Sequence, residues 1–506
     1  MPEIENRKDS PIVTVIGIIT LIAALFAVVL LLVPQSIWNL MSSMVDFKPA
    51  MGLFGSEFVG FDNYHQAIAM PIFAAGFRST LSHAFISAAL LFLSSIATGY
   101  LLLAVGKIRW LRHGLCTLLL IPLVIPGELI ANAALSTRLV PLEANAGTGL
   151  LLAAICTIRY IGLPALLVSA AISHGKRSWS VPLLAGGATS LGLFALLGMF
   201  DFDFLWHLPP TLDQAQGLNT IAFGISFANV QYDIGAAINT ILIMITAFLL
   251  LLAAWPITML LKRLFPWGVE PSEAPIRQRL VALVIPGAAV SFVAIALAIL
   301  SAFADARELA QYTGLPIYVL LAVFTAGCNT VLCYCLARPA ICSGKAGRPV
   351  MLCVLVILTF ITAGNTPVPC GEFFLFHYLG LADTWFAIAL SGIASVWGVW
   401  PLIFAAKSLG IRSNTDWFRR MWKPSLALFA LQAAMLMNNS MPSLIYLNRK
   451  TLLHPLVLAF QQTQSGGFMN PALLALLTLA VPVALLLTVR TAFNEKDSLG
   501  LFLPGR

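Results

Sequence analysis

The chain has 506 residues and a net charge of +8, yet only 10% of its residues are charged, 59% are hydrophobic and its mean hydropathy is +0.91. A soluble domain needs more polar surface than this to cover its core, so the composition excludes an ordinary soluble protein. The basic residues are scattered between apolar stretches and form no stripe interleaved with aromatic residues, which argues against nucleic-acid binding.

The apolar stretches predict an all-α polytopic membrane protein. An uncharged stretch of about 20 residues forms a helix that is long enough to cross a bilayer core of about 30 Å. The first stretch is too long for the apolar region of a secretory signal, so we expect it to be retained as a span. In chain order the sequence predicts about twelve transmembrane helices, at residues 12–34, 80–105, 114–135, 147–172, 181–200, 234–261, 280–303, 315–337, 349–368, 384–406, 424–445 and 468–490.

The basic residues predict the orientation of these spans. Twelve spans bring both termini to one side of the membrane, and most of the 29 Lys and Arg residues then fall in segments on that side. Positive residues collect on the cytoplasmic side of membrane proteins, where they also meet anionic lipid head groups. We therefore predict a multi-pass protein with both termini in the cytoplasm.

A polar segment with several prolines divides the chain into two halves. Residues 266–279 are predicted to be a cytoplasmic linker between a first half, 1–265, and a second half, 280–506. Each half contains six predicted spans, and in each an early helix runs into a basic turn that another helix follows at once. This is a weak internal repeat in parallel orientation, and duplicated membrane halves typically enclose a pathway at their interface.

The sequence contains no pattern typical of a metal site, a redox cofactor or an enzyme. Its eight cysteines lie within or beside predicted spans, without a C-x-x-C pair or a His/Cys cluster, so we interpret them as packing residues. No Ser/His/Asp set and no pair of carboxylates at a catalytic spacing is recognisable. We therefore expect neither a cofactor nor catalysis in this chain.

Three segments of the first half carry a family resemblance. Glu57–Tyr64 reads EFVGFDNY, Leu120–Pro126 reads LIPLVIP, and Tyr232–Ala237 reads YDIGAA. In this order they resemble permease subunits of binding-protein-dependent sugar importers of the ATP-binding-cassette (ABC) class, the maltose and glycerol-phosphate type. The second half is similar to the partner permease, with weaker matches at Tyr334–Arg338, His377–Thr384 and Lys423–Ala427.

The resemblance implies two fused permease subunits in a bacterial inner membrane. It implies an external solute-binding protein that delivers a carbohydrate or related polar solute to outer loops at 35–79, 201–233 and 446–467. It also implies cytoplasmic ATPase subunits, which would carry out the hydrolysis of ATP.

The cytoplasmic loops depart from the family pattern. Family permeases dock on the ATPase through a loop with an E-A-A-x-x-x-G pattern, but the matching segments Ser173–Ser180 and Lys407–Pro424 lack it. The segment 407–424 is predicted to be a short amphipathic element that either docks on a partner or lies on the lipid surface. The candidate contacts with an ATPase are Lys176, Arg177, Trp417, Arg419, Arg420 and Trp422.

Polar side chains inside predicted spans are candidates for the substrate pathway. Arg159, near the middle of span 147–172, either lines a cavity or forms an ion pair with Glu128 on the preceding span. Asn438 and Asn439 point about 100° apart if they are helical, so at least one of them faces other protein. They are the leading pathway candidates, with hydrogen bonding between helices as the alternative, and Gln432 ranks below them.

Together these features predict the transmembrane permease component of an ABC importer. Because both coupling loops depart from the pattern, a transport-inactive relative that acts as a membrane scaffold is the alternative. A secondary transporter is a third hypothesis, but it needs carboxylates inside the membrane for ion coupling, and Glu128 is the one candidate in the predicted spans.

Overall fold

The computed structural model describes residues 11–48, 50–105, 109–125, 127–136, 140, 147–174, 183, 185–187, 202–208, 216–264, 315–343, 347–364, 370–393, 395–437, 439–449, 452–454 and 457. The predicted spans 280–303 and 468–490, most of 181–200, and the linker 266–279 lie outside these residues. The number of spans and the division into two fused halves therefore stay predictions.

The described part of the chain is helical and contains four helices that are long and apolar enough to cross a membrane. They are α1 (Pro11–Ser42), α4 (Pro71–Ala104), α12 (Tyr232–Leu264) and α14 (Leu315–Cys342). An all-α fold with several helices of membrane-spanning length is thereby confirmed. The shorter helices are α5 (Arg109–Val124), α6 (Gly127–Ser136), α7 (Thr148–Tyr160), α8 (Gly162–His174), α10 (Phe202–Leu205), α11 (Leu218–Phe223), the π-helix η4 (Gly224–Ala228), α15 (Gly347–Gly364), α16 (Cys370–Tyr378), α17 (Trp385–Leu390), α18 (Val399–Ser408), α19 (Asn414–Arg420), α20 (Trp422–Met437) and α21 (Met441–Tyr446).

Several predicted spans are divided into two helices. The span 147–172 is divided between α7 and α8, and 424–445 is divided between α20 and α21. Pro164 and Pro442 lie within four residues after these breaks, where a proline has no N–H to donate and its ring crowds the carbonyl of the fourth residue before it. The span 384–406 is divided between α17 and α18, where Pro401 is likewise close after the break as the third residue of α18, and Gly392 in the gap has a left-handed backbone with φ of +84°.

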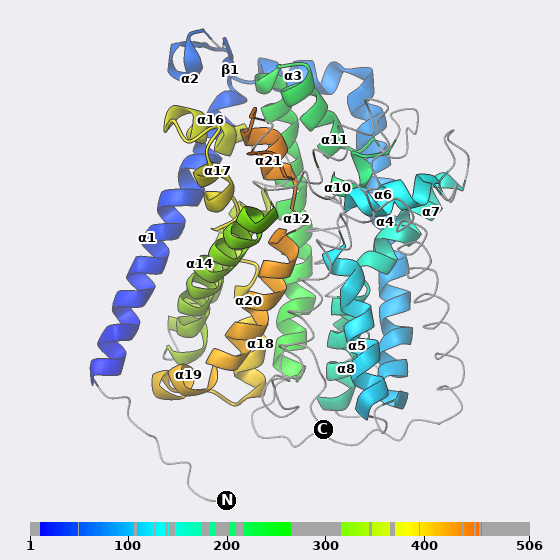
Figure 1. Cartoon of the computed structure of the whole chain (residues 1–506), viewed down its shortest axis with the longest axis vertical. Helices are drawn as coiled ribbons and strands as arrows, with labels where there is room; N and C mark the ends of the chain where they lie inside the picture. The colour runs from blue at the N-terminus through cyan, green and yellow to red at the C-terminus, as the bar shows by residue number, and fades with distance from the viewer. Residues whose placement is uncertain are drawn as a thin grey trace, which may run out of the picture.

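A small cap lies at one end of the molecule and α19 at the other, and we call these the α3 end and the α19 end (Figure 1). The cap pairs β1 (Val45–Asp46) with β2 (Glu57–Phe58) in antiparallel fashion, and encloses α2 (Gly52–Gly55) between them. After β2, Gly60 has a φ of +63°, which glycine adopts without strain, and the chain enters α3 (Asp62–Ala69).

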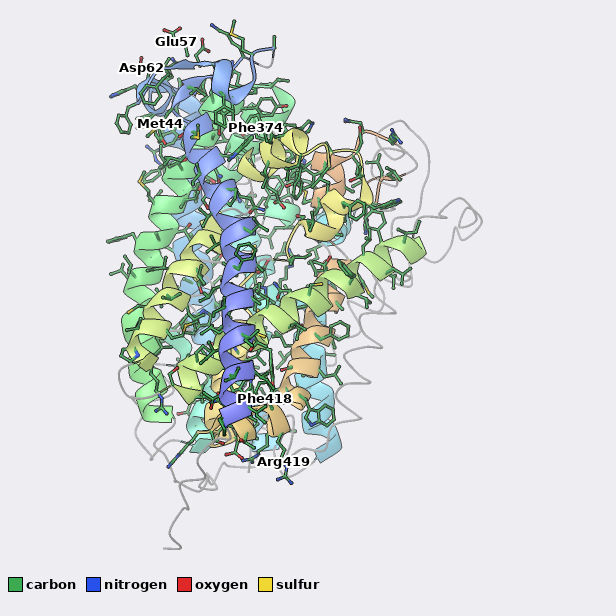
Figure 2. All side chains as sticks on the ribbon, turned by 90° about the vertical axis from the view of Figure 1, so that its left-hand side faces the viewer. Met44, Glu57, Asp62, Phe374, Phe418 and Arg419 are labelled. Atoms are coloured by element: carbon green, nitrogen blue, oxygen red, sulfur yellow. The ribbon has the colours of Figure 1, made fainter. Side chains whose placement is uncertain are left out.

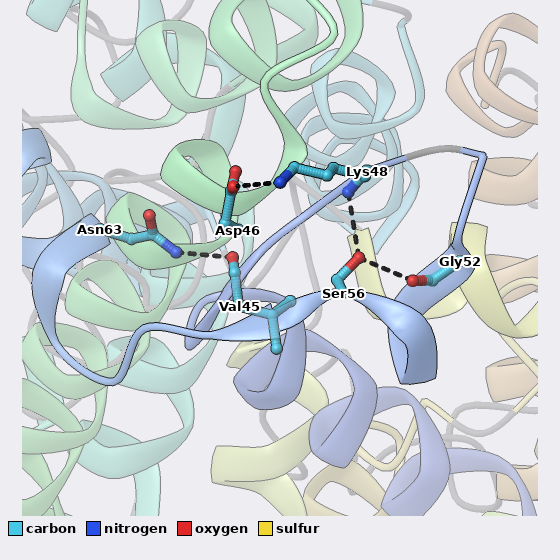
Figure 3. A network of polar contacts seen from close by, with 6 residues as sticks. All are labelled: Val45, Asp46, Lys48, Gly52, Ser56 and Asn63. Carbon is cyan, nitrogen blue, oxygen red and sulfur yellow. Dashed lines mark hydrogen bonds and ion pairs between the residues drawn. The ribbon is translucent and has the colours of Figure 1, made fainter.

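Side-chain hydrogen bonds tie the cap together (Figure 3). The Asn63 amide donates to the carbonyl oxygens of Ser43 and Val45, at 3.2 and 2.9 Å. Lys48 pairs with Asp46 at 3.1 Å, and its backbone N–H donates to the hydroxyl of Ser56 at 3.0 Å. The segment that carried the family resemblance, 57–64, is therefore an ordered element at the α3 end.

The helices pack in two neighbouring groups. In one group α14 packs against α18 and α20, with α1 alongside; in the other α4 packs against α7 and α8. A cluster of Leu91, Leu123, Tyr160 and Leu431 joins α4, α5 and α7 to α20, so the two groups meet at the middle of the bundle. Within the predicted outer loop 201–233, α11 is buried throughout and Leu218 N–H donates to the Thr80 hydroxyl at 2.8 Å, while the side of the membrane on which it lies stays a prediction.

Candidate functional site

A polar stripe runs along the middle of α14. Thr325, Asn329 and Cys333 follow one another at intervals of four residues, so their side chains lie on the same face of the helix. All three are buried, with 3%, 2% and 0% of their surfaces exposed. A buried polar side chain in an apolar bundle needs a hydrogen-bond partner, and the partners identify what the stripe does.

The stripe faces the gap between α17 and α18. The Thr325 hydroxyl donates to the carbonyl oxygen of Ala389, at the end of α17, at 2.8 Å. The Asn329 amide nitrogen lies 2.7 Å from the carbonyl oxygen of Ile393 and 2.6 Å from that of Ser395. The carbonyls at the end of a helix receive no hydrogen bond from within the helix. Inside a bilayer no water molecule is present to donate one instead. The stripe therefore stabilises a helix break inside the bundle.

Gln432 on α20 completes this arrangement. Its amide oxygen accepts a hydrogen bond from the Thr330 hydroxyl at 2.8 Å, and its amide nitrogen donates to the side-chain oxygen of Asn329. Packing at this point is close, because a Cβ atom at Gly398 would lie 2.8 Å from the Gln432 amide nitrogen. The α14 polar cluster is the name we give to Thr325, Asn329, Thr330, Cys333 and Gln432, together with the carbonyls of Ala389, Gly392, Ile393 and Ser395.

The structure changes the interpretation of the two adjacent asparagines. The helix α20 ends at Met437, and the Asn439 N–H donates to the Leu436 carbonyl at 3.2 Å in a turn before α21. The prediction that this stretch is helical is therefore wrong, and Asn439 is half-buried at a second helix break. Asn438 lies outside the described residues.

Arg159 is buried in the last turn of α7, and its Cζ atom lies 5.4 Å from the centre of the Tyr160 ring. The side chain of Glu128 lies outside the described part of the chain, so the predicted ion pair stays a prediction. Tyr160 and Leu431 belong to one apolar cluster, which brings the chain around Arg159 close to the chain around Gln432. Among the predicted pathway residues that the structure describes, Arg159 and Gln432 are therefore brought into one region by the fold.

The segment 407–424 contains a short helix at the α19 end. Ser413 caps it, because its hydroxyl oxygen accepts from the Asp416 N–H at 3.1 Å and its O–H donates to the Asp416 carboxylate at 2.9 Å. Trp417 is fully buried against the Tyr334 ring, with 5.4 Å between the ring centres. The prediction of Trp417 as a surface contact is therefore wrong, because Trp417 lies on the face of α19 that packs against α14.

The rest of this predicted contact surface is exposed where it is described. Arg419, Arg420 and Trp422 are exposed at the α19 end, and Figure 2 shows Arg419 and Phe418 at the opposite end of the molecule from Glu57. Lys176 and Arg177 lie outside the described residues. The exposed face thus combines two cationic side chains with two aromatic rings.

The predicted span 315–337 ends just before Arg338, but α14 continues past this residue to Cys342 and buries it, leaving 5% of its surface exposed. Its guanidinium donates to the Asn414 side-chain oxygen at 3.2 Å and to the carbonyl oxygen of Gly17. Arg338 therefore connects α14 to both α19 and α1.

Within the described residues, no group of three or more His, Cys, Asp or Glu side chains gathers as a metal site would. Comparisons with protein families, with curated proteins and with solved structures each find no match to this chain.

Proposed function

We propose that this chain is the membrane permease component of an ABC importer for a small polar solute of the carbohydrate class. The observation that supports this most is the α14 polar cluster, a broken helix with amide and hydroxyl groups in the middle of an apolar bundle. Interrupted helices inside membranes occur where backbone and side-chain polar groups line a cavity or bind a transported molecule.

The chemistry of the cluster favours an uncharged solute. Its side chains are two amides, two hydroxyls and one thiol, and none of them carries a charge. Amides and hydroxyls offer both donors and acceptors, which pair with the hydroxyl groups of a sugar. Arg159 and Asn439 are the proposed secondary contacts.

The two ends of the molecule suit different partners. The α19 end carries Arg419, Arg420 and Trp422 and would face the cytoplasm of a bacterial cell, where an ATPase subunit would dock. The α3 end, with the ordered cap at 43–64, would face outward and receive a solute-binding protein. Both termini would then be cytoplasmic.

A membrane scaffold remains the second candidate, and one observation favours it. The amides of Asn329 and Gln432 and the hydroxyl of Thr330 are all engaged with each other or with the gap carbonyls. A cluster that is fully satisfied internally can hold a static bundle together without any ligand.

Purification of the full-length protein from its native membrane in mild detergent distinguishes the two. We expect an ATPase subunit in stoichiometric amount and measurable ATP hydrolysis. The double variant Arg419→Ala/Arg420→Ala should lose the ATPase, whereas Arg78→Ala, a change of an exposed arginine on α4, should retain it. Co-purification of other membrane proteins without an ATPase would instead support the scaffold.

A further inference from the structure

Glu372 is a buried carboxyl group that the proposed function does not use. It lies in the first turn of α16, and only 8% of its surface is exposed. Its Oε1 atom has no hydrogen-bond partner within the described part of the chain. Burying a carboxylate without a cationic partner is unfavourable, so a second function has to be considered for this position.

Three helices meet over Glu372. Phe376 of α16, Ala387 of α17 and Tyr446 of α21 form one apolar cluster, and the rings of Phe376 and Tyr446 are 5.0 Å apart. We call this the α16–α17–α21 junction. The helix α16 is also pressed against α1, because a Cβ atom at Gly371 would lie 1.8 Å from the carbonyl oxygen of Gln35.

The junction adjoins both helix breaks. The helix α17 ends at Leu390, directly before the gap that the α14 polar cluster holds, and α21 begins directly after the turn at Asn439. Movement of α16 relative to α17 and α21 would therefore be transmitted to the two interrupted segments. The helix α16 lies near the α3 end and belongs to none of the four candidate spans.

Hydroxyl groups are the direct electrostatic partners of Glu372. The helix α12 also packs against α16, and it places Tyr232 against the rings of Phe373 and Phe374, with the carboxyl group of Asp233 next in the chain. Burial raises the pKa of Glu372 to about 7, and the neighbouring hydroxyls of Tyr446 and Ser391 oppose part of that rise. On α16 itself, burial raises the pKa of the Cys370 thiol to about 12, so the thiol stays protonated. The helix α1 presents the uncharged side chains of Gln35 and Asn39, and the one ion pair of the described residues, Lys48–Asp46, lies in the cap.

We propose that Glu372 is a proton-binding site that holds the α16–α17–α21 junction closed when it is protonated and loosens the junction when it ionises. A protonated carboxyl is neutral and can stay among apolar side chains. A carboxylate without a counter-ion has to gain water, and water reaches it when α16 separates from α21. This inference does not rest on the proposed function, because an importer and a scaffold would both undergo the change.

The sign of the pH dependence follows from the raised pKa. The folded protein holds the proton more tightly than the unfolded chain, whose carboxyl has its ordinary pKa of 4.5. The contribution of Glu372 to stability is therefore fully present below 4.5 and is lost as the pH rises through about 7.

Hydrogen–deuterium exchange of the full-length protein, corrected for the intrinsic pH dependence of exchange, tests the proposal. At about pH 5 we expect residues 370–391 and 441–447 to be protected, and at about pH 9 we expect them to exchange at least about tenfold faster. In Glu372→Gln the protection should persist at both pH values. In Glu57→Gln, a matched change on the exposed cap, it should vary as in the wild type. Equal pH dependence in wild type and Glu372→Gln would overturn the proposal.

A second measurement covers the case in which Glu372→Gln does not fold. Infrared spectroscopy of the wild type should show a protonated carboxyl band that disappears as the pH rises through neutrality. In Tyr446→Phe, which removes a hydroxyl that lowers the pKa, this transition should move to higher pH. A wild-type carboxyl band that is already absent at about pH 5 would also overturn the proposal.

Discussion

Arg338 of α14 donates a hydrogen bond to the carbonyl oxygen of Gly17 in α1, across 321 residues of sequence. The same guanidinium holds Asn414, so one buried cation connects two long helices to the short helix at the α19 end. The Gly17 carbonyl oxygen also accepts a hydrogen bond from the Thr20 hydroxyl, at 3.0 Å.

The loss of this connection should loosen α19. Arg338→Met preserves the length of the aliphatic part of the side chain but removes the guanidinium that donates to the Asn414 side-chain oxygen. We expect a loss of about 1–3 kcal/mol in the free energy of unfolding and faster proteolysis within residues 409–421. Thermal unfolding in detergent and limited proteolysis measure both. Arg78→Met, at an exposed position, is the control, and equal behaviour of the two variants would contradict the role of Arg338.

Removal of the Asn329 amide should destabilise the α17–α18 gap. In Asn329→Ala the carbonyls of the half-buried residues Ile393 and Ser395 lose the Asn329 amide as a donor. We expect a loss of at least about 2 kcal/mol, and faster hydrogen exchange confined to residues 389–398. Asn229→Ala, at an exposed position before α12, should leave both unchanged. If the two variants are equally stable, water or another group satisfies these carbonyls.

The close approach of α1 and α16 should not tolerate a methyl group. A Cβ atom at residue 371 would lie 1.8 Å from the Gln35 oxygen and 2.8 Å from the Asn39 nitrogen, and both are backbone atoms that cannot rotate away. We expect Gly371→Ala to lose about 1–3 kcal/mol of stability. At Gly114 in α5 nothing lies within 4 Å of such a Cβ atom, so Gly114→Ala should be neutral or stabilising. A neutral Gly371→Ala would show that the helices are further apart.

The turn after α16 should weaken in acid. Asp383 has a left-handed φ of +60°, and its carboxylate accepts hydrogen bonds from the backbone and side chain of Asn448, which hold its pKa below the ordinary value of 3.8. Its contribution is present above 3.8 and is lost as the pH falls through the lowered pKa. Asp383→Asn tolerates the same backbone conformation but does not titrate.

Proteolysis between residues 379 and 384 as a function of pH measures this effect. The wild type should be better protected than Asp383→Asn at neutral pH, and the difference should vanish in acid. A difference that does not depend on pH would assign the protection to the backbone conformation alone.

Several elements were predictable because their causes are local. The length of an apolar stretch determines whether a helix can cross a bilayer, and α1, α4, α12 and α14 lie where such stretches occur. The Ser413–Asp416 pair is a short-range signal for a helix start, and Gly60 marks a backbone conformation that other residues avoid. The common face of Thr325, Asn329 and Cys333 on α14 also has a local cause, because residues at intervals of four lie on one side of a helix.

Other features depend on partners that are distant in the sequence. The gap between α17 and α18 is bridged by Asn329, more than 60 residues earlier, which donates to the carbonyls of Ile393 and Ser395. Arg338 is charged and Trp417 lies in an amphipathic segment, so the sequence favours exposed positions for both. Packing between helices nevertheless buries them. The amino-acid sequence by itself determined that this chain is helical and suited to a membrane. Only the tertiary structure decided where helices break and which polar groups are buried, because hydrogen bonding and desolvation depend on neighbours brought together by folding.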